Sequence, residues 1–152
     1  MNVAYINPFI MSTVTTFETM TKTRPTAGKP TVKTEPFPTY DVSGIIGLSG
    51  DAQGSIAISF PKLVALKIVS LMLGTEIKVV GPELTDGVGE LANIISGNAK
   101  QHFENMNLSI SLPNVVIGKD HMLGVQKGAP TIVVPFTSAI GSFSIEVTLK
   151  TK

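Results

Sequence analysis

The most informative stretch of this chain is Thr85-Asp86-Gly87-Val88-Gly89-Glu90-Leu91-Ala92-Asn93-Ile94-Ile95-Ser96-Gly97-Asn98-Ala99-Lys100. A helix advances by about 100° per residue, and at that step the apolar residues of this stretch fall on one face. They are Val88, Leu91, Ala92, Ile95, Ala99, Phe103 and Met106. The sequence therefore predicts an amphipathic helix from about Thr85 to Met106, with its apolar face packed on a sheet.

The opposite face of the same helix is polar. Asp86, Glu90, Asn93 and Gly97 lie along it, and Lys100 continues the line. Every amphipathic helix has a solvated face, so the stripe has a structural interpretation that needs no function. The functional interpretation is that a carboxylate and a carboxamide one turn apart act on another protein. For Asp86 we favour a helix cap, because a carboxylate near the first turn accepts hydrogen bonds from free N–H groups.

Glycines interrupt this otherwise helical stretch. Each interior glycine costs about 0.5–1 kcal/mol relative to alanine, so its presence needs a reason. Gly87 and Gly89 fit either a loose start of the helix or the close approach of another backbone. Gly97 lies further inside, and close approach of another backbone explains it better.

Apolar periodicity predicts two more helices. The second, from Pro61 to Gly74, is apolar nearly all round, so we expect it to be buried on several sides. In the first, Asn7-Pro8 either caps a late start or kinks an early one. Its apolar stripe consists of Val3, Ile6, Ile10, Val14, Phe17 and Met20.

Strands are predicted from β-prone runs. Val42–Leu48 and Ser55–Phe60 form a hairpin across a turn at residues 50–54. The later runs are Leu108–Leu112, Val115–Ile117, Leu123–Gln126, Thr131–Thr137 and Phe143–Leu149. Residues 22–40 contain four prolines and form a loop with a short extended piece around Val32.

Together these elements predict an α+β fold in one domain spanning residues 1–152, with two long helices and a third apolar helix on an antiparallel sheet. The run Gly54-Ser55-Ile56-Ala57-Ile58 is similar to Gly141-Ser142-Phe143-Ser144-Ile145, and a helix precedes each hairpin. This pattern indicates an internal duplication of a helix-plus-hairpin unit. A chance similarity of two Gly-Ser turns explains it equally well.

Composition excludes several classes of function. Net charge is +1 and the lysines are scattered, so the chain lacks the basic patch of a nucleic-acid-binding protein. Without cysteine there is no disulfide framework or thiolate catalysis, and His102 and His121 lack metal-ligand spacing. We expect no cofactor of its own. The apolar run Leu63–Leu73 is shorter than the roughly 20 residues of a membrane span, and the start lacks a secretory signal, so we expect a cytoplasmic protein.

The pattern Glu-x-x-Asn followed by Gly-Asn-Ala, from Glu90 to Ala99, resembles the signature helix of the CheC, CheX and FliY phosphatases. Nearly the whole chain fits the resemblance, and its single signature is similar to CheX. CheC carries a second copy on its other long helix. Here Glu18 is followed three residues later by Thr21, which implies one active face per subunit. The runs that also resemble CheX are Asn7-Pro8-Phe9, Gly44-Ile45-Ile46-Gly47 and Gly54-Ser55.

The resemblance implies a CheC-like fold and hydrolysis of the aspartyl phosphate of a CheY-type receiver, whose own Mg²⁺ and lysine lie at the phosphoryl group. Asn93 would orient the attacking water and Glu90 would pair with that lysine. Asp86, Gly97 and Lys100 would contact the phosphorylated receiver. The resemblance also implies a homodimer joined through the sheets, which a long edge strand would support. A binding module that docks on a receiver or on the flagellar switch without hydrolysis is the alternative, because fold alone does not separate the two.

Overall fold

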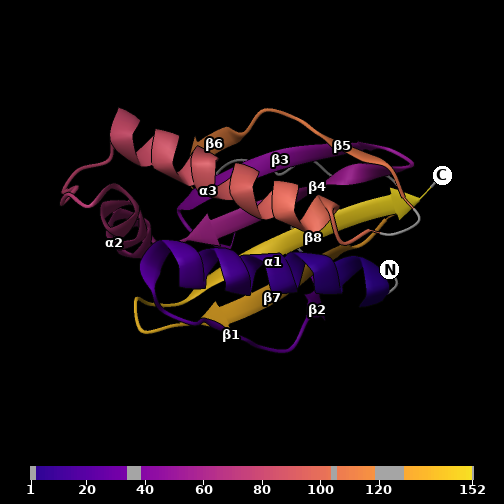
Figure 1. Cartoon of the computed structure of the whole chain (residues 1–152), viewed down its shortest axis with the longest axis horizontal. Helices are drawn as coiled ribbons and strands as arrows, with labels where there is room; N and C mark the ends of the chain where they lie inside the picture. Colours follow the sequence, from indigo (N-terminus) through magenta and orange to yellow (C-terminus); the bar gives the residue numbers. More distant parts are fainter. Residues whose placement is uncertain (1–2, 34–38, 104–105, 119–128, 152) are drawn as a thin grey trace.

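The computed structural model describes residues 3–33, 39–103, 106–118 and 129–151 (Figure 1). The elements in this part of the chain are α1 Val3–Thr21, β1 Thr26–Ala27, β2 Thr31–Val32, β3 Val42–Gly50, β4 Ala52–Phe60, α2 Lys62–Leu73, α3 Pro82–Lys100, β5 Leu108–Ile110, β6 Asn114–Ile117, β7 Thr131–Thr137 and β8 Phe143–Thr151. The predicted α+β class is confirmed.

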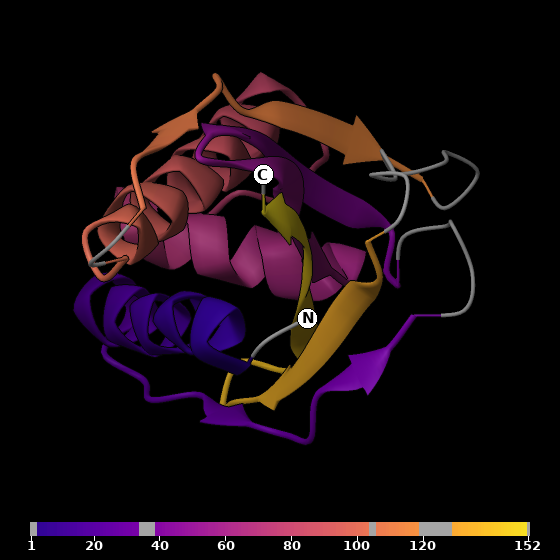
Figure 2. The ribbon, with the colours of Figure 1, turned by 90° about the vertical axis from the view of Figure 1, so that its right-hand side faces the viewer.

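The described strands form one antiparallel sheet in the order β1-β7-β8-β4-β3-β5, with β2 also paired to β7 and β6 to β3. Helices α1 and α3 lie side by side along one face of the sheet, and α2 lies across one end of this pair (Figure 1). In the end-on view of Figure 2, α1 and α3 lie to the left of β7 and β8, and α2 crosses the middle of the picture. Burying one face of the sheet under the helices creates the hydrophobic core.

The pairing repeats a pattern that supports the predicted duplication. Each long helix is followed by two short strands and then by a hairpin, β3–β4 after α1 and β7–β8 after α3. The short strands β1 and β2 pair with β7, whereas β5 and β6 pair with β3. The short strands of each unit therefore pair with the outer hairpin strand of the other unit. The pairing of β4 with β8 joins the two units at the centre of the sheet.

Helix α1 begins at Val3 and includes Pro8, so the early start is correct. Threonine hydroxyls donate to the carbonyl oxygen four residues earlier, for example Thr13 Oγ1 to Phe9 O at 2.7 Å. These bonds satisfy threonines that otherwise disfavour a helix. Of the predicted stripe, Ile6 and Phe17 are buried, and Phe9, which the prediction omitted, is buried as well.

Helix α2 differs from its prediction. It follows Pro61 and ends at Gly74, whose φ of 69° suits glycine. However, only one side is buried: Leu63 is 70% exposed, Leu71 50% and Leu73 52%. The expectation of burial on several sides was wrong, because an all-apolar pattern cannot show how many neighbours surround a helix.

Strand predictions were largely correct. Strand β7 has the predicted bounds, β2 is the extended piece around Val32, and β5 and β6 are slightly shifted. Strands β3 and β4 run further into the predicted turn, because Gly50 pairs with Leu108 and Ala52 with Thr151. The predicted strand at residues 123–126 lies outside the described residues. Within the described part the long strands are internal, so the expected long edge strand is not found among these residues.

The sheet face away from the helices carries buried polar side chains, among them Ser144, Glu146 and Thr148 of β8. On β8, Phe143, Ile145 and Val147 point into the core, so Glu146 lies on the other face, where it is buried. The Glu146 carboxylate accepts a hydrogen bond from Thr39 Oγ1 at 2.8 Å and forms an ion pair with Lys33. This pair fastens the segment after β2 to the centre of the sheet.

Candidate functional site

The signature lies on α3, which begins earlier and ends sooner than predicted. Gly81 is the N-cap residue and Pro82 the first helical residue, a position that proline favours because its missing N–H would have no helical partner. The helix ends at Lys100, before Phe103 and Met106. The first-turn acid is Glu83, so Asp86 lies in the second turn and the prediction of an Asp86 cap was wrong.

Tight contacts fix α3 on the rest of the fold. Its apolar face is buried as predicted, and a Cβ at Gly44 of β3 would lie only 3.1 Å from the Ala92 Cβ. Ser12 Oγ of α1 donates a buried hydrogen bond of 2.6 Å to the Ile95 carbonyl oxygen. Asn98 Nδ2 lies 3.5 Å from Thr16 Oγ1. A helix held by both the sheet and α1 presents its outer face in a fixed orientation.

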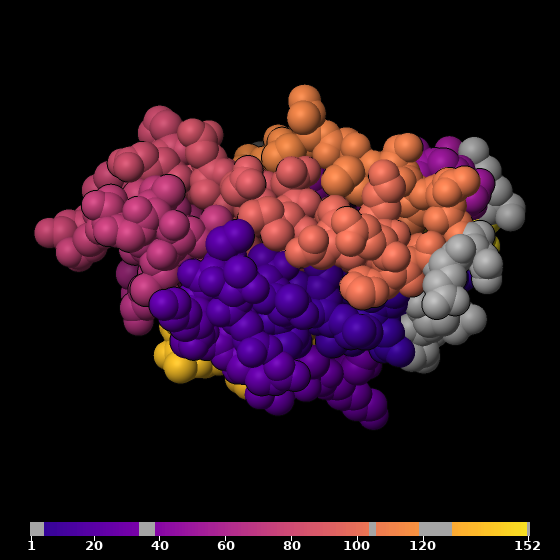
Figure 3. Space-filling model, viewed as in Figure 1, coloured from indigo at the N-terminus to yellow at the C-terminus, as the bar shows by residue number. Residues whose placement is uncertain are grey.

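The predicted polar stripe lies on this outer face. Asp86, Glu90 and Lys100 are exposed, and Asn93 and Gly97 are partly buried. Figure 3 shows α3 as an open band of the surface directly above α1. Among the residues that the structure describes, neither Asp86 nor Glu90 forms an ion pair. The carboxylate of Glu90 and the amide of Asn93 are thus brought together, one turn apart, where another protein can reach them.

The three glycines of α3 have different surroundings. A Cβ at Gly87 would lie 2.6 Å from Val69 Cγ1, and one at Gly89 would lie 3.4 Å from Pro113 Cγ. Both residues lie within the helix, so a loose helix start does not explain them. Both are also buried, so the approach of a partner does not explain them either. A Cβ at Gly97 would meet nothing within 4 Å. Of the three, only Gly97 leaves open space on the polar stripe.

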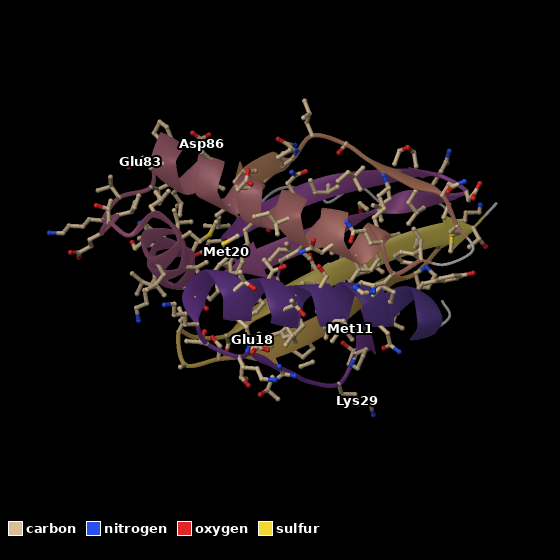
Figure 4. All side chains as sticks on the ribbon, in the orientation of Figure 1. Met11, Glu18, Met20, Lys29, Glu83 and Asp86 are labelled. Carbon is tan, nitrogen blue, oxygen red and sulfur yellow. The ribbon has the colours of Figure 1, made fainter. Side chains whose placement is uncertain are left out.

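A groove beside the stripe was missed by the sequence reasoning. It has a volume of about 560 Å³ and is formed where the C-terminal ends of α1 and α2 meet the N-terminal half of α3. Its lining residues are Met20, Met72, Leu73, Glu83, Asp86, Gly87, Glu90 and Ile94. Figure 4 shows Glu83 and Asp86 on α3, with Met20 on α1. Periodicity places Glu83 near Asp86, but it gives no information on which helices come together.

The acidic residues of α3 do not form a metal centre. Across residues 3–33, 39–103, 106–118 and 129–151, no group of three or more His, Asp and Glu side chains is arranged to hold a metal ion. No helix in these same residues is long and apolar enough to cross a membrane.

The sequence model of a family described as Chemotaxis phosphatase CheX matches residues 42–137, which include all of α3. The chain belongs to the CheX family of chemotaxis phosphatases. It is therefore a phosphatase, and Glu90 and Asn93 lie inside the segment that the family shares.

Individual CheX and CheC-like proteins agree with this assignment. The CheY-P phosphatase CheX of Thermotoga maritima is 29% identical over 123 residues, covering 79% of each chain. A chemotactic CheC-like protein of Shewanella oneidensis is 37% identical, with a TM-score of 0.85 over 99% of this chain and 100% of that one. The crystal structure of a CheX–CheY–BeF3–Mg²⁺ complex from Borrelia burgdorferi matches with 26% identity and a TM-score of 0.79, over 96% of this chain and 97% of that one.

Proposed function

We propose that this chain, as one domain over residues 1–152, hydrolyses the aspartyl phosphate of a CheY-type response regulator by inserting Glu90 and Asn93 into the receiver's active site. The observation that supports the proposal is an exposed carboxylate and an amide one turn apart on α3. The opposite face of this helix is held in place by the sheet and by α1. The relative from Thermotoga maritima is a CheY-P phosphatase, and CheY is present in the Borrelia burgdorferi complex.

Asn93 orients the attacking water in this proposal. Its Oδ1 accepts a hydrogen bond from the water, which places a water lone pair in line with the phosphorus–oxygen bond to the aspartate. As the water oxygen bonds to phosphorus, that bond breaks and its electron pair remains on the aspartyl carboxylate. The proton that the water loses passes to solvent, and inorganic phosphate leaves. Amide groups suit this task because they accept and donate hydrogen bonds without titrating.

Glu90 has a different role, because its carboxylate pairs with the lysine of the receiver's active site and so orients α3 in the cleft. The receiver supplies the Mg²⁺, in keeping with the Mg²⁺ of the CheX–CheY complex. Gly97 gives the receiver's loops room to approach. Asp86 and Lys100 contact the receiver on either side of the pair. We expect the protein to work in the cytoplasm as a homodimer.

The test follows the decay of the acyl phosphate on each CheY-type receiver of the source organism, with and without this protein. We expect Asn93→Ala to bind the BeF3⁻-activated receiver normally but to slow the accelerated decay about 100-fold, the usual loss when a positioned hydrogen-bonding group is removed. Glu90→Ala should lose both binding and activity. Gln53→Ala, which removes an exposed amide from β4, is the matched control and should leave both unchanged.

The proposal fails if the wild-type protein leaves the decay of every receiver unchanged. If the protein also binds an activated receiver in that case, the non-catalytic docking module becomes the correct interpretation. If Asn93→Ala accelerates decay as well as Gln53→Ala does, another residue orients the water.

A further inference from the structure

The groove beside α3 combines an acidic side with an apolar side. Glu83, Asp86 and Glu90 are spaced three and four residues apart, so their side chains share one side of the helix. Met20 from α1, with Met72 and Leu73 from α2, supplies the apolar side. Three segments far apart in the sequence thus build one surface.

Charge in the groove is unbalanced. No lysine, arginine or histidine is among the described residues that line it. Within the described residues, Glu83, Asp86 and Glu90 form no ion pair. The positive end of the helix dipole favours Glu83 in the first turn, but its effect fades beyond that turn. Asp86 and Glu90 therefore remain uncompensated negative charges next to apolar surface.

The apolar side is only partly covered, because Met20 and Met72 are partly buried and Leu73 is exposed. Leu73 is 52% exposed although its side chain borders a groove of about 560 Å³, a size within the range of sites that enclose small ligands. The flexible side chains of Met20 and Met72 can adjust to the shape of an incoming group. A partner that inserts an apolar side chain here would remove this surface from water.

We propose that this groove is the docking site for a segment of the receiver that carries an apolar side chain next to a lysine or arginine. Charge complementarity identifies the occupant, because Glu90 already pairs with the receiver's active-site lysine and an all-apolar segment would leave Glu83 and Asp86 unpaired. The groove is also continuous with the phosphatase face, since Glu90 belongs to both. The inference rests on the proposed function in naming the receiver as the partner. It adds a contact that selects among receivers at a distance from the phosphoryl group.

The apolar side is tested by a matched pair of leucines on α2. Leu73 lines this groove, whereas Leu71, exposed by 50%, lines a different groove with Leu63 and Ile140. The probe is the fluorescently labelled CheY-type receiver activated with BeF3⁻ and Mg²⁺, and fluorescence anisotropy gives the Kd. Leu73→Ser should raise the Kd about tenfold, as expected for a buried apolar contact at an interface. Leu71→Ser should leave the Kd unchanged.

The acidic side is tested with a second pair. Glu83→Gln removes one charge from the groove, and Glu76→Gln removes one from the α2–α3 connection, where Glu76 lines the other groove. We expect Glu83→Gln to raise the Kd about threefold at low salt, with the difference shrinking at high salt, because rim charges act mainly by steering. Glu76→Gln should match the wild type at both salt concentrations.

The inference is overturned if Leu73→Ser and Glu83→Gln bind the activated receiver as tightly as Leu71→Ser and Glu76→Gln. The proposed function would survive that result, provided that the wild type accelerates dephosphorylation. The opposite outcome is that Leu73→Ser and Glu83→Gln weaken binding, while the wild type leaves the decay of the receiver's acyl phosphate unchanged. The groove is then upheld as a docking site, and the proposed hydrolysis is wrong.

Discussion

Gly87 lies so close to Val69 that a Cβ at position 87 would stand 2.6 Å from Val69 Cγ1. Real side chains do not approach this closely, so α3 and α2 touch at a point where only glycine fits. The contact fixes the distance between α2 and the N-terminal half of α3, which carries Asp86 and Glu90. The sequence left Gly87 open between a loose helix start and the close approach of another backbone, and in the structure it is an internal packing contact.

Gly87→Ala should therefore destabilise the protein. Overpacking costs about 1–3 kcal/mol, because Val69 is β-branched and has little freedom to move. Alanine regains at most about 1 kcal/mol through its higher helix propensity. We expect a net loss of about 1–2 kcal/mol in the free energy of unfolding, measured by urea denaturation. A midpoint equal to or above that of the wild type would contradict the packing.

Gly97 should respond in the opposite way. A Cβ there meets nothing within 4 Å, so Gly97→Ala should gain about 0.5–1 kcal/mol of stability from helix propensity. Gly97→Gln should also fold at least as stably as the wild type but slow receiver dephosphorylation about tenfold, because the longer side chain obstructs the approaching receiver. Urea denaturation and the acyl-phosphate decay assay separate the two effects. Full activity of Gly97→Gln would show that the receiver does not approach this position.

Two buried serines, Ser12 on α1 and Ser96 on α3, provide a test of hydrogen bonding. Ser12 Oγ donates to the Ile95 carbonyl oxygen at 2.6 Å, whereas Ser96 Oγ is buried and has no hydrogen-bond partner among the described residues. Ser12→Ala should lose about 1 kcal/mol of stability, the usual net value of a buried hydrogen bond. Ser96→Ala should lose nothing or gain slightly, because it removes an unpaired polar atom and raises helix propensity. Equal losses in thermal denaturation would refute the assigned contacts.

The buried ion pair between Lys33 and Glu146 gives a further prediction. Lys33→Met leaves the Glu146 carboxylate buried with Thr39 as its one partner among the described residues, and such a change costs about 3–5 kcal/mol. In Lys33→Met/Glu146→Met both charges are absent, so most of this loss should be recovered. A double-mutant cycle in urea measures the coupling. Additive effects of the two substitutions would mean that the pair contributes nothing.

Local patterns predicted much of the fold. The two faces of α3 followed from apolar spacing, because a helix repeats every 3.6 residues whatever surrounds it. Strand β7 was predicted with its correct bounds, since a β-rich run between turn residues has few alternatives. The start of α3 at Pro82 was missed although proline in the first turn is a local signal. Its end at Lys100 was missed because Phe103 and Met106 continue the apolar period after the backbone has left the helix.

The candidate pair was also visible in the sequence. Spacing alone placed Glu90 and Asn93 on the outer face of one helix, and the structure leaves Glu90 exposed and Asn93 partly so. Their role in hydrolysis stays a prediction until the decay assay is done. Burial of α2 was predicted wrongly because hydrophobicity records the preference of each residue for the interior and not the number of neighbours.

The sequence by itself determined the periodicity, and hence the helices, the strands and the polar stripe with its signature, because these patterns depend on residues only two to four positions apart. Only the tertiary structure decided that Gly87 is a packing contact, that Leu71 and Leu73 line different grooves, and that Met20 and Glu90 line the same one. These relationships join separate helices. They arise when the core is packed at close range, and no local spacing encodes them.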